Sequence, residues 1–440
     1  MRILHYGLGY PPERSGGLVK YVTDLMVEQV KQNHEVAYLF PGKINIFNSS
    51  TKIKKERIRI TGVTSFELIN SLPLAVFGGI RDPEQFRKKV DPSVYSSLLD
   101  DFRPDIIHVH SLMGLHKEFF EVATDKKIKI IYTSHDYFGL SPNPTFYFNG
   151  KSWDEENSLN FWLNVSEGAM SVRKLRMLQL PFYDKARDFI KKFKKNSFQN
   201  DKHYILKGNK DFSKKFLESF KGLRNYYQEI FDLINYFHFN SSISQQVFLQ
   251  NILNPIKGEV INITNSTISG GNKVIELNLN EIEKITYIGQ YADFKGFYDF
   301  LEIASQIKDK TFEIYGESID VEVPKNVINK GRFYAEDISK VFQDAELIVI
   351  PSKCKETYGF LVPESLDFKV PVIVSSNVGA KDLIPKRAIL DSKCFVKNFI
   401  SLLGSGEKII FESELVTIHE LCLKIDLVYK FVIKEENGVI

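Results

Sequence analysis

The chain has 440 residues, of which 43% are hydrophobic and 13% aromatic, and its formal net charge is +3. This length predicts two domains or slightly more, and the hydrophobic content argues against a disordered protein. The small net charge argues against a dedicated nucleic-acid binder.

The cellular compartment is predicted from the position of the first strand, from the length of the apolar stretches and from the spacing of the cysteines. Arg2–Tyr6 reads as a strand directly after Met1, so we expect no signal peptide. No apolar stretch approaches the roughly 20 residues that span a bilayer. Cys354, Cys394 and Cys422 are widely spaced and form no metal-binding pattern, which fits a reducing compartment. We expect a cytoplasmic protein.

A Gly-Gly turn follows the first strand. Gly16 and Gly17 precede a helix with apolar residues from Leu18 to Val30, and Glu35–Phe40 reads as the next strand. A glycine turn at a helix N-terminus can receive a phosphate, but it can equally be a simple tight turn.

The pattern is weaker from residue 43 to 101, and the basic run there reads as a solvated face. Residues 104–111 then give a buried strand that contains His108 and His110. We expect these two histidines to face opposite sides of the sheet and to share no metal. A helix over 115–124 and a strand over 129–133 follow, and the strand ends at His135, which by itself reads as a buried structural histidine.

Residues 143–233 read as a mostly helical insertion. Residues 173–202 contain 10 Lys and Arg against 3 Asp. This basic, aromatic segment predicts either an amphipathic helix on an anionic membrane or an ordinary surface helix with solvated lysines. It is also where an acceptor-specific insertion would lie.

Strands and helices also alternate through the rest of the chain, which predicts two Rossmann-like domains facing across a cleft. Pro255–Gly258 reads as a hinge. The strands are expected at 234–240, 260–265, 285–289, 311–315 and 327–330, and the helices at 244–253, 296–307, 335–342 and 412–434, the last returning to the first domain.

Residues 346–375 predict a strand, a loop, a helix and a second strand, the arrangement in which ligands bind where strand gives way to helix. Glu356 lies in the loop and Glu364 in the helix. The amides of residues 358–361 would form an anion site at the helix N-terminus, and Gly359 would allow a close approach. By spacing alone, both glutamates read equally well as solvated surface acids.

The Glu-x7-Glu pattern of Glu356 and Glu364, followed by the VPVIVS strand, resembles the donor site of retaining glycosyltransferases of family 4, which have the GT-B fold. The resemblance implies that Glu356 binds the transferred sugar and Glu364 the ribose of the nucleotide. It implies a sugar- or acceptor-facing role for His135. Retention in this family is usually attributed to attack from the face that the leaving group departs from, so no enzymic nucleophile is implied.

Lys295 and Gly296 match the family's second phosphate element, but Gln290 stands where an arginine is usual. The two cations of that element neutralise the diphosphate, so no metal or other cofactor is expected. Gln290 carries no charge and cannot form the bidentate fork of an arginine. This departure motivates the alternative of a catalytically silent partner subunit that stabilises an active transferase. A third reading, a GT-B sugar-nucleotide epimerase, fits poorly because it has no use for the basic insertion.

The resemblance therefore predicts an α/β protein of the GT-B fold, with residues 1–255 on the acceptor side, 256–411 as the donor domain and 412–440 as the returning helix. The expected function is retaining, metal-independent transfer of a sugar from a nucleotide sugar, with UDP favoured, to a glycan, lipid-linked or protein acceptor. The AT-rich bias of the composition suggests bacterial surface polysaccharide synthesis. The predicted catalytic residues are His135, Lys295 and Glu356; the donor-binding residues are Gly17, Gln290, Lys295, Gly316, Glu317, Arg332, Phe333, Tyr358, Gly359, Phe360, Leu361 and Glu364; and the acceptor-side residues are His110 and Asp136.

Overall fold

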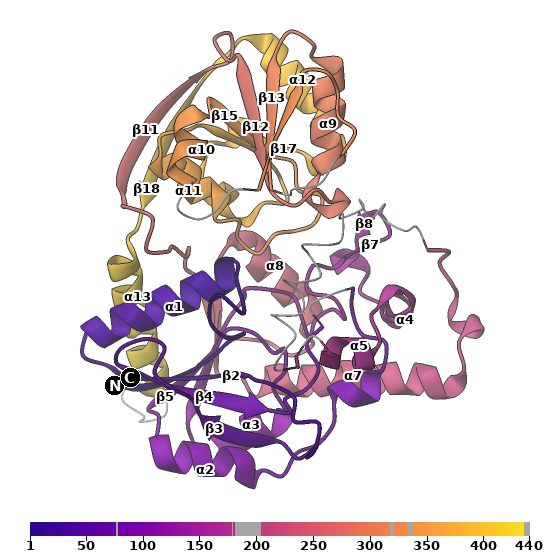
Figure 1. Cartoon of the computed structure of the whole chain (residues 1–440), viewed down its shortest axis with the longest axis vertical. Coiled ribbons are helices and arrows are strands. Elements are labelled where there is room, and N and C mark those ends of the chain that lie inside the picture. Colours follow the sequence, from indigo (N-terminus) through magenta and orange to yellow (C-terminus); the bar gives the residue numbers. More distant parts are fainter. Residues whose placement is uncertain (76–77, 178, 181–203, 317–320, 333–337, 435–440) are drawn as a thin grey trace.

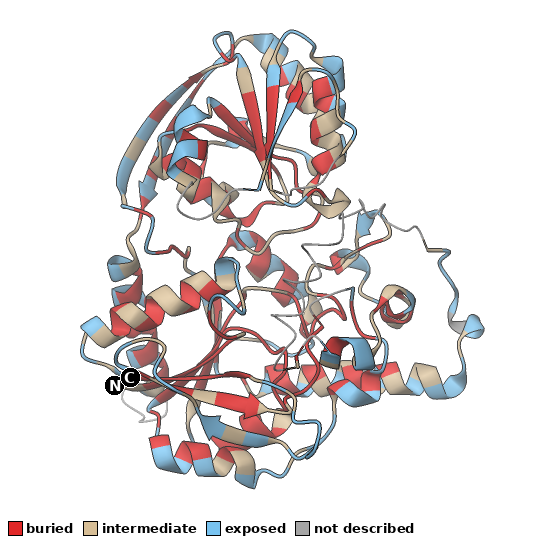
Figure 2. Cartoon of the chain, in the orientation of Figure 1, coloured by how far each residue is buried: buried red, intermediate tan, exposed pale blue. Residues whose placement is uncertain are grey.

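The computed structural model describes residues 1–75, 78–177, 179–180, 204–316, 321–332 and 338–434 (Figure 1). It consists of two α/β units, each built on its own sheet, stacked one above the other in the view of Figure 1. Strands of both sheets are largely buried (Figure 2). This explains why several of them read as continuous apolar runs, because strands covered on both faces have no polar side.

The first unit has an eight-stranded sheet in the order β10-β9-β6-β5-β1-β2-β4-β3, in which only the β3–β4 pair is antiparallel. Helices cover both of its faces. The strands are β1 (Arg2–Tyr6), β2 (Glu35–Pro41), β3 (Lys52–Lys55), β4 (Val63–Ile69), β5 (Ile106–Val109), β6 (Lys129–Thr133), β9 (Tyr236–Phe239) and β10 (Gly258–Val260). The main helices are α1 (Gly17–Lys31), α2 (Ser93–Phe102), α3 (Lys117–Asp125), α7 (Lys214–Asp232) and α8 (Ser242–Asn251).

The predicted insertion leads from β6 towards α7. The described parts of residues 143–233 include a short hairpin of β7 (Tyr147–Phe148) and β8 (Lys151–Ser152), the helices α4 (Leu159–Gly168) and α5 (Val172–Met177), and α7. Most of the basic segment 173–202, which predicted a membrane-binding helix, lies outside the described residues.

The second unit has a six-stranded parallel sheet in the order β14-β13-β12-β15-β16-β17. Its strands are β12 (Lys284–Ile288), β13 (Thr311–Tyr315), β14 (Val327–Gly331), β15 (Leu347–Ile350), β16 (Val372–Ser375) and β17 (Ile389–Leu390). Its helices are α9 (Phe297–Gln306), α10 (Ile338–Asp344), α11 (Leu361–Asp367) and α12 (Phe395–Ser405).

A two-stranded antiparallel ribbon connects the units. Its strands, β11 (Gly271–Asn278) and β18 (Lys408–Leu415), run along one edge of the second unit (Figure 1). Next to the ribbon, Ser269 donates from its amide and its hydroxyl to Asp367 at the end of α11, at 2.9 and 2.7 Å. The chain then returns to the first unit as α13 (Ile418–Lys434), which packs against α1.

Two predicted elements differ from the structure. Of the strand expected at 260–265, only Val260 is in a strand, and it belongs to β10 of the first sheet, beyond the expected hinge. Residues 412–415, expected as helix, belong to β18, whose residues are alternately exposed and buried. That alternation follows from pairing with β11, a partner more than a hundred residues away.

Among the described residues, no helix is both long enough and apolar enough to cross a bilayer.

Candidate active site

The loop between β15 and α11 holds the first predicted carboxylate. Glu356 accepts a hydrogen bond from Lys295 Nζ at 2.9 Å and another from Ser352 Oγ. The Glu356 side chain is 12% exposed and that of Lys295 is 31% exposed. Burial lowers the pKa of the Lys295 ammonium group, but the Glu356 carboxylate outweighs this effect and holds the pKa above its usual value. The structure therefore places a cation beside this loop.

The turn that carries Lys295 requires a glycine after it. Gly296 has φ +70°, and a Cβ atom there would lie 1.9 Å from the carbonyl oxygen of Pro351. The turn is held against the loop by the amides of Lys353 and Cys354, which donate to the carbonyl oxygen of Phe294. The Lys-Gly pair is thus explained by packing as well as by charge.

The N-terminus of α11 follows a glycine with a left-handed backbone. Gly359 has φ +99°, and a Cβ atom there would lie 3.1 Å from Glu356 Oε2. The amide of Val362 donates to the Gly359 carbonyl, so the amides of residues 359–361 form the open end of the helix. Tyr358 is buried before it. This is the predicted anion site, next to the Glu356–Lys295 pair.

Glu364 lies on α11 and is half-buried. Burial raises the pKa of its carboxyl group to about 7, an effect opposed by a hydrogen bond from Asn265 and by the charge of Lys20. Asn265 Nδ2 donates to Glu364 Oε1 at 3.2 Å. A carboxyl group with this pKa changes its charge near neutral pH, which a solvated glutamate does not.

The N-termini of α1 and α11 meet between the two units. A Cβ atom on Gly17 would lie 2.8 Å from Cδ2 of Phe360. The Gly-Gly turn therefore lets the ring of Phe360 lie against the α1 backbone. Both glycine-containing turns predicted from the sequence are brought to one place.

His135 adjoins the same loop from the first unit. Its carbonyl oxygen accepts a hydrogen bond from Thr357 Oγ1 at 2.9 Å, which joins the ends of β6 and β15. Asp136 accepts from Ser111 Oγ at 3.1 Å, and burial raises the pKa of its carboxyl group to about 6. His110 is buried, with Nδ1 3.4 Å from His135 Nε2. The predicted acceptor-side residues therefore form one group.

The remaining predicted donor residues follow the strands β12 to β14. Gly316 contacts the end of β12, since a Cβ atom there would lie 1.8 Å from the carbonyl oxygen of Gly289. Gln290 and Arg332 are exposed. The predicted Glu317 and Phe333 lie outside the described residues.

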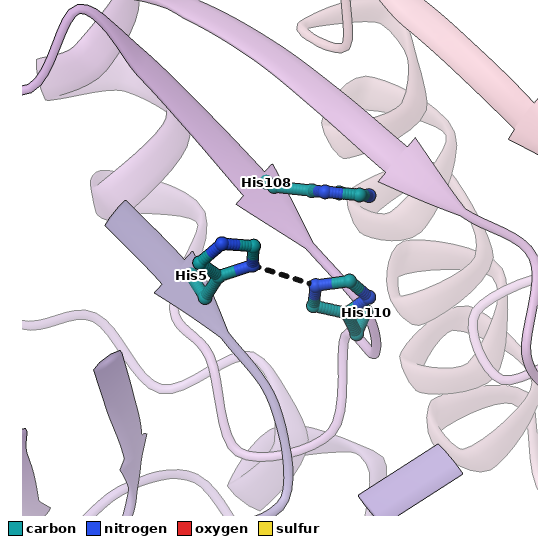
Figure 3. Close-up of side chains that lie close together, drawn as sticks. All are labelled: His5, His108 and His110. Carbon is teal, nitrogen blue, oxygen red and sulfur yellow. Dashed lines mark hydrogen bonds between the residues drawn. The ribbon is translucent and has the colours of Figure 1, made fainter. Parts of the chain in front are cut away.

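The expectation that His108 and His110 face opposite sides of the sheet is wrong. Residues two apart in a strand point to the same face, and the two rings are 4.1 Å apart between centroids. With His5 they form a buried group in which one ring nitrogen of each lies within 4.8 Å of the others (Figure 3). By distance, these three histidines could hold a metal ion.

Sequence reasoning missed the contacts that the insertion makes with the second unit. Lys355 Nζ lies 2.5 Å from Asp154, whose side chain is 2% exposed. Tyr147 donates its hydroxyl hydrogen to Asp293 at 2.5 Å. Asn265, which the sequence places only at the end of an expected strand, contacts Glu364. Because these contacts join distant segments, no local pattern signals them.

Comparison with known families gives a match in each half of the chain. Residues 15–166 match the family described as Glycosyltransferase Family 4. Residues 282–404 match the family described as Glycosyl transferases group 1. The two matches include β12, the Glu356 loop and α11 on one side, and α1 and His135 on the other.

A curated relative and two solved structures are also similar. The relative is an uncharacterized 42.6 kDa protein in the cps region of Klebsiella pneumoniae, 22% identical over 292 residues. The alignment includes 65% of this chain and spans 60% of the relative's length. The trehalose-phosphate synthase (UDP-forming) of Burkholderia xenovorans, in complex with glucose-6-phosphate, has a TM-score of 0.51 at 10% identity, with 92% of each chain covered. The sucrose-phosphate synthase of Thermosynechococcus elongatus has a TM-score of 0.50 at 11% identity, with 98% of each chain covered. These two likenesses show a common fold.

Proposed function

We propose that this chain, which has the GT-B fold and matches a glycosyltransferase family model in each half, transfers a sugar, with retention of configuration, from a nucleotide sugar to a glycan, lipid-linked or protein acceptor. The observation that carries the proposal is the convergence of the Glu356–Lys295 pair with α11, which has its open end at this loop and carries half-buried Glu364, while Thr357 joins the same loop to the backbone of His135. Each of these groups suits one part of a nucleotide sugar.

In this proposal the diphosphate binds at the end of α11. The amides of residues 359–361 and the positive end of the helix would hold its oxygens. Lys295 would neutralise charge on the leaving diphosphate and stabilise it as the glycosidic bond breaks. We expect no metal ion to be required for this step.

Glu364 would accept hydrogen bonds from the ribose hydroxyls, and Glu356 would orient the transferred sugar. Glu356 is suited to this because Lys295 and Ser352 fix its carboxylate. Gly316, Gln290 and Arg332 would surround the base. The acceptor would enter from the His135 side and attack the face that the diphosphate leaves, so no side chain needs to act as a nucleophile.

The favoured donor is a UDP-sugar, in keeping with the UDP-forming enzyme of the same fold. Surface polysaccharide synthesis is the favoured pathway class, because the curated relative is a protein of a cps region. A glycan or lipid-linked acceptor would fit that setting, at the inner face of the plasma membrane.

The test is to incubate the full chain with UDP-, GDP- and ADP-sugars and an acceptor extract and to measure release of nucleoside diphosphate. We expect release with one base, abolished in Glu356→Gln and retained in Glu302→Gln, a matched change on an exposed face of α9. If no donor binds and no diphosphate forms, the proposal is wrong.

The second candidate is a silent partner subunit, and Gln290 favours it. Gln290 is exposed and places no charge at the end of β12. Its backbone carbonyl oxygen accepts a hydrogen bond from the Tyr287 hydroxyl at 2.5 Å. If this position limits the chemistry, Gln290→Arg should raise turnover. A partner subunit would instead bind donor without turnover, with or without the substitution, and would raise the activity of a co-expressed transferase.

A further inference from the structure

A continuous set of hydrogen bonds links His135 to the segment that connects the two units. All of its members are side chains except the last, which is a backbone carbonyl. His135 is half-buried, and the other side chains have 0% exposure. In order, the members are His135, His110, His5, Gln29, Tyr429, His108, Thr133, His238 and the carbonyl oxygen of Ile261. We call this set the histidine chain.

The successive donor–acceptor distances, in that order, are 3.4, 3.0, 2.7, 3.2, 2.6, 2.6, 3.0 and 2.8 Å. Figure 3 shows the hydrogen bond between His5 and His110, with the ring of His108 beside them. The side chains of the histidine chain come from the strands β1, β5, β6 and β9, from the segments that follow β5 and β6, and from the helices α1 and α13.

The histidines of the chain are neutral at pH 7. Burial lowers the pKa of His5 and His238 to about 4 and that of His135 to about 3. It also lowers the pKa of His108 and His110 well below the usual value. A neutral imidazole has one nitrogen that donates and one that accepts. The hydrogen-bond partner at one end of the histidine chain therefore determines which nitrogen or oxygen atom donates and which accepts in every following bond.

The direction is set at Ile261, because a carbonyl oxygen can only accept. His238 must donate from Nε2, so its Nδ1 accepts from the Thr133 hydroxyl. Thr133 has then used its hydrogen and must accept from His108 Nε2. His108 Nδ1 is left as an acceptor, and the Tyr429 hydroxyl donates to it.

The same reasoning continues through the second half. Tyr429 accepts from Gln29 Nε2, which leaves Gln29 Oε1 to accept from His5 Nε2. His5 Nδ1 then accepts from His110 Nε2. His110 Nδ1 in turn accepts from His135 Nε2. Every hydrogen bond of the histidine chain thus has one donor and one acceptor, and all of them donate in the direction from His135 to Ile261.

We propose that the histidine chain holds His135 as the tautomer protonated on Nε2, and that Tyr429 of α13 is a positioning residue that maintains this state. His135 Nδ1 then carries a lone pair, and none of the described residues donates to it. With the proposed function as its premise, this nitrogen accepts a hydrogen bond from a sugar hydroxyl. His135 in this state orients substrate and does not act as an acid.

A metal ion on His5, His108 and His110 is the competing explanation of the group in Figure 3. The histidine chain already gives every ring nitrogen of these three residues a partner. A metal would have to replace several of those hydrogen bonds, whereas the chain satisfies all of them with neutral groups. The geometry therefore favours the hydrogen-bonded arrangement.

The test is NMR spectroscopy of the full chain labelled with 15N-histidine, in which the two nitrogen shifts report the tautomer directly. His135 signals are assigned by their loss in His135→Gln. We expect a protonated Nε2 and an unprotonated Nδ1 in the wild type. A protonated Nδ1, or averaged shifts from mixed tautomers, would overturn the proposal, as would stoichiometric Zn²⁺ binding that moves the His5 and His110 signals. This measurement needs neither donor nor turnover, so its result is separate from that of the proposed function.

Tyr429→Phe tests the positioning role. It removes the hydroxyl that donates to His108 and accepts from Gln29, so we expect mixed tautomers at His135 and a fall in kcat of about tenfold with little change in KM. The matched control is Tyr21→Phe, since the Tyr21 ring lies 4.8 Å from that of His135 and its buried hydroxyl has no partner among the described residues. A single tautomer in Tyr429→Phe, or equal losses in both variants, would refute the role of Tyr429.

Discussion

Donor binding should strengthen as the pH rises through neutrality, because of Glu364. Burial raises the pKa of this carboxyl group to about 7. Below that pH it is mainly protonated, and above it the carboxylate is available to accept hydrogen bonds from the ribose hydroxyls. Donor affinity should therefore be weak at pH 6 and stronger at pH 8.

The size of the effect follows from the pKa. With a value of about 7, roughly one tenth of the molecules have an ionised Glu364 at pH 6 and roughly nine tenths at pH 8. If only the ionised form binds the ribose well, affinity should rise about tenfold, or about 1.4 kcal/mol. The Asp136 carboxyl group, whose pKa is about 6, also titrates in this range.

Isothermal titration calorimetry with UDP-glucose at pH 6, 7 and 8 measures this effect, because the diphosphate diester does not itself titrate there. Glu364→Gln is the control, since it keeps an acceptor oxygen and removes the titration. Its affinity should be nearly independent of pH. Equal wild-type affinities at pH 6 and 8, or an undiminished pH dependence in Glu364→Gln, would refute the reasoning.

Two further predictions concern the neighbouring contacts. Lys295→Met removes the cation beside Glu356, so we expect weaker donor binding and a loss of about 1–3 kcal/mol of unfolding free energy in urea; unchanged values for both would contradict the role of the pair. Gly17→Ala places a Cβ atom 2.8 Å from the Phe360 ring, and it should raise the KM for the donor several-fold. Gly404→Ala, where a Cβ atom has no neighbour within 4 Å, should leave KM unchanged, and equal effects of the two alanines would argue against the contact.

Much of the fold could be predicted because buried parallel strands are short apolar runs. The strands 2–6, 129–133 and 311–315 lie where the sequence predicts them. The local strand–loop–helix order also brought Glu356 and Lys295 to the same end of the second sheet. These features depend on residues close together in the sequence or on a repeated arrangement.

The remaining features depend on partners far away in the chain. The ribbon strands β11 and β18 are half-exposed, and each is stabilised by its pairing with the other. Neither segment therefore has the continuous apolar pattern that predicts a buried strand. Asn265 was overlooked because its partner Glu364 is 99 positions away. The prediction that His108 and His110 face opposite sides of the sheet was wrong because residues two apart in a strand point to the same face.

The ribbon also determines how the two units can move. Since Gly271 pairs with Leu415, both connections leave the second unit at one point, so we expect any relative motion of the units to be a rotation about that point. Ser269 ties this point to Asp367, the last residue of α11, while the opposite end of that seven-residue helix begins beside Phe360. One short helix thus reaches from this point to the proposed nucleotide-sugar site. Moving the two units apart would displace α11 directly. Release of the nucleotide product would then be coupled to opening of the two units.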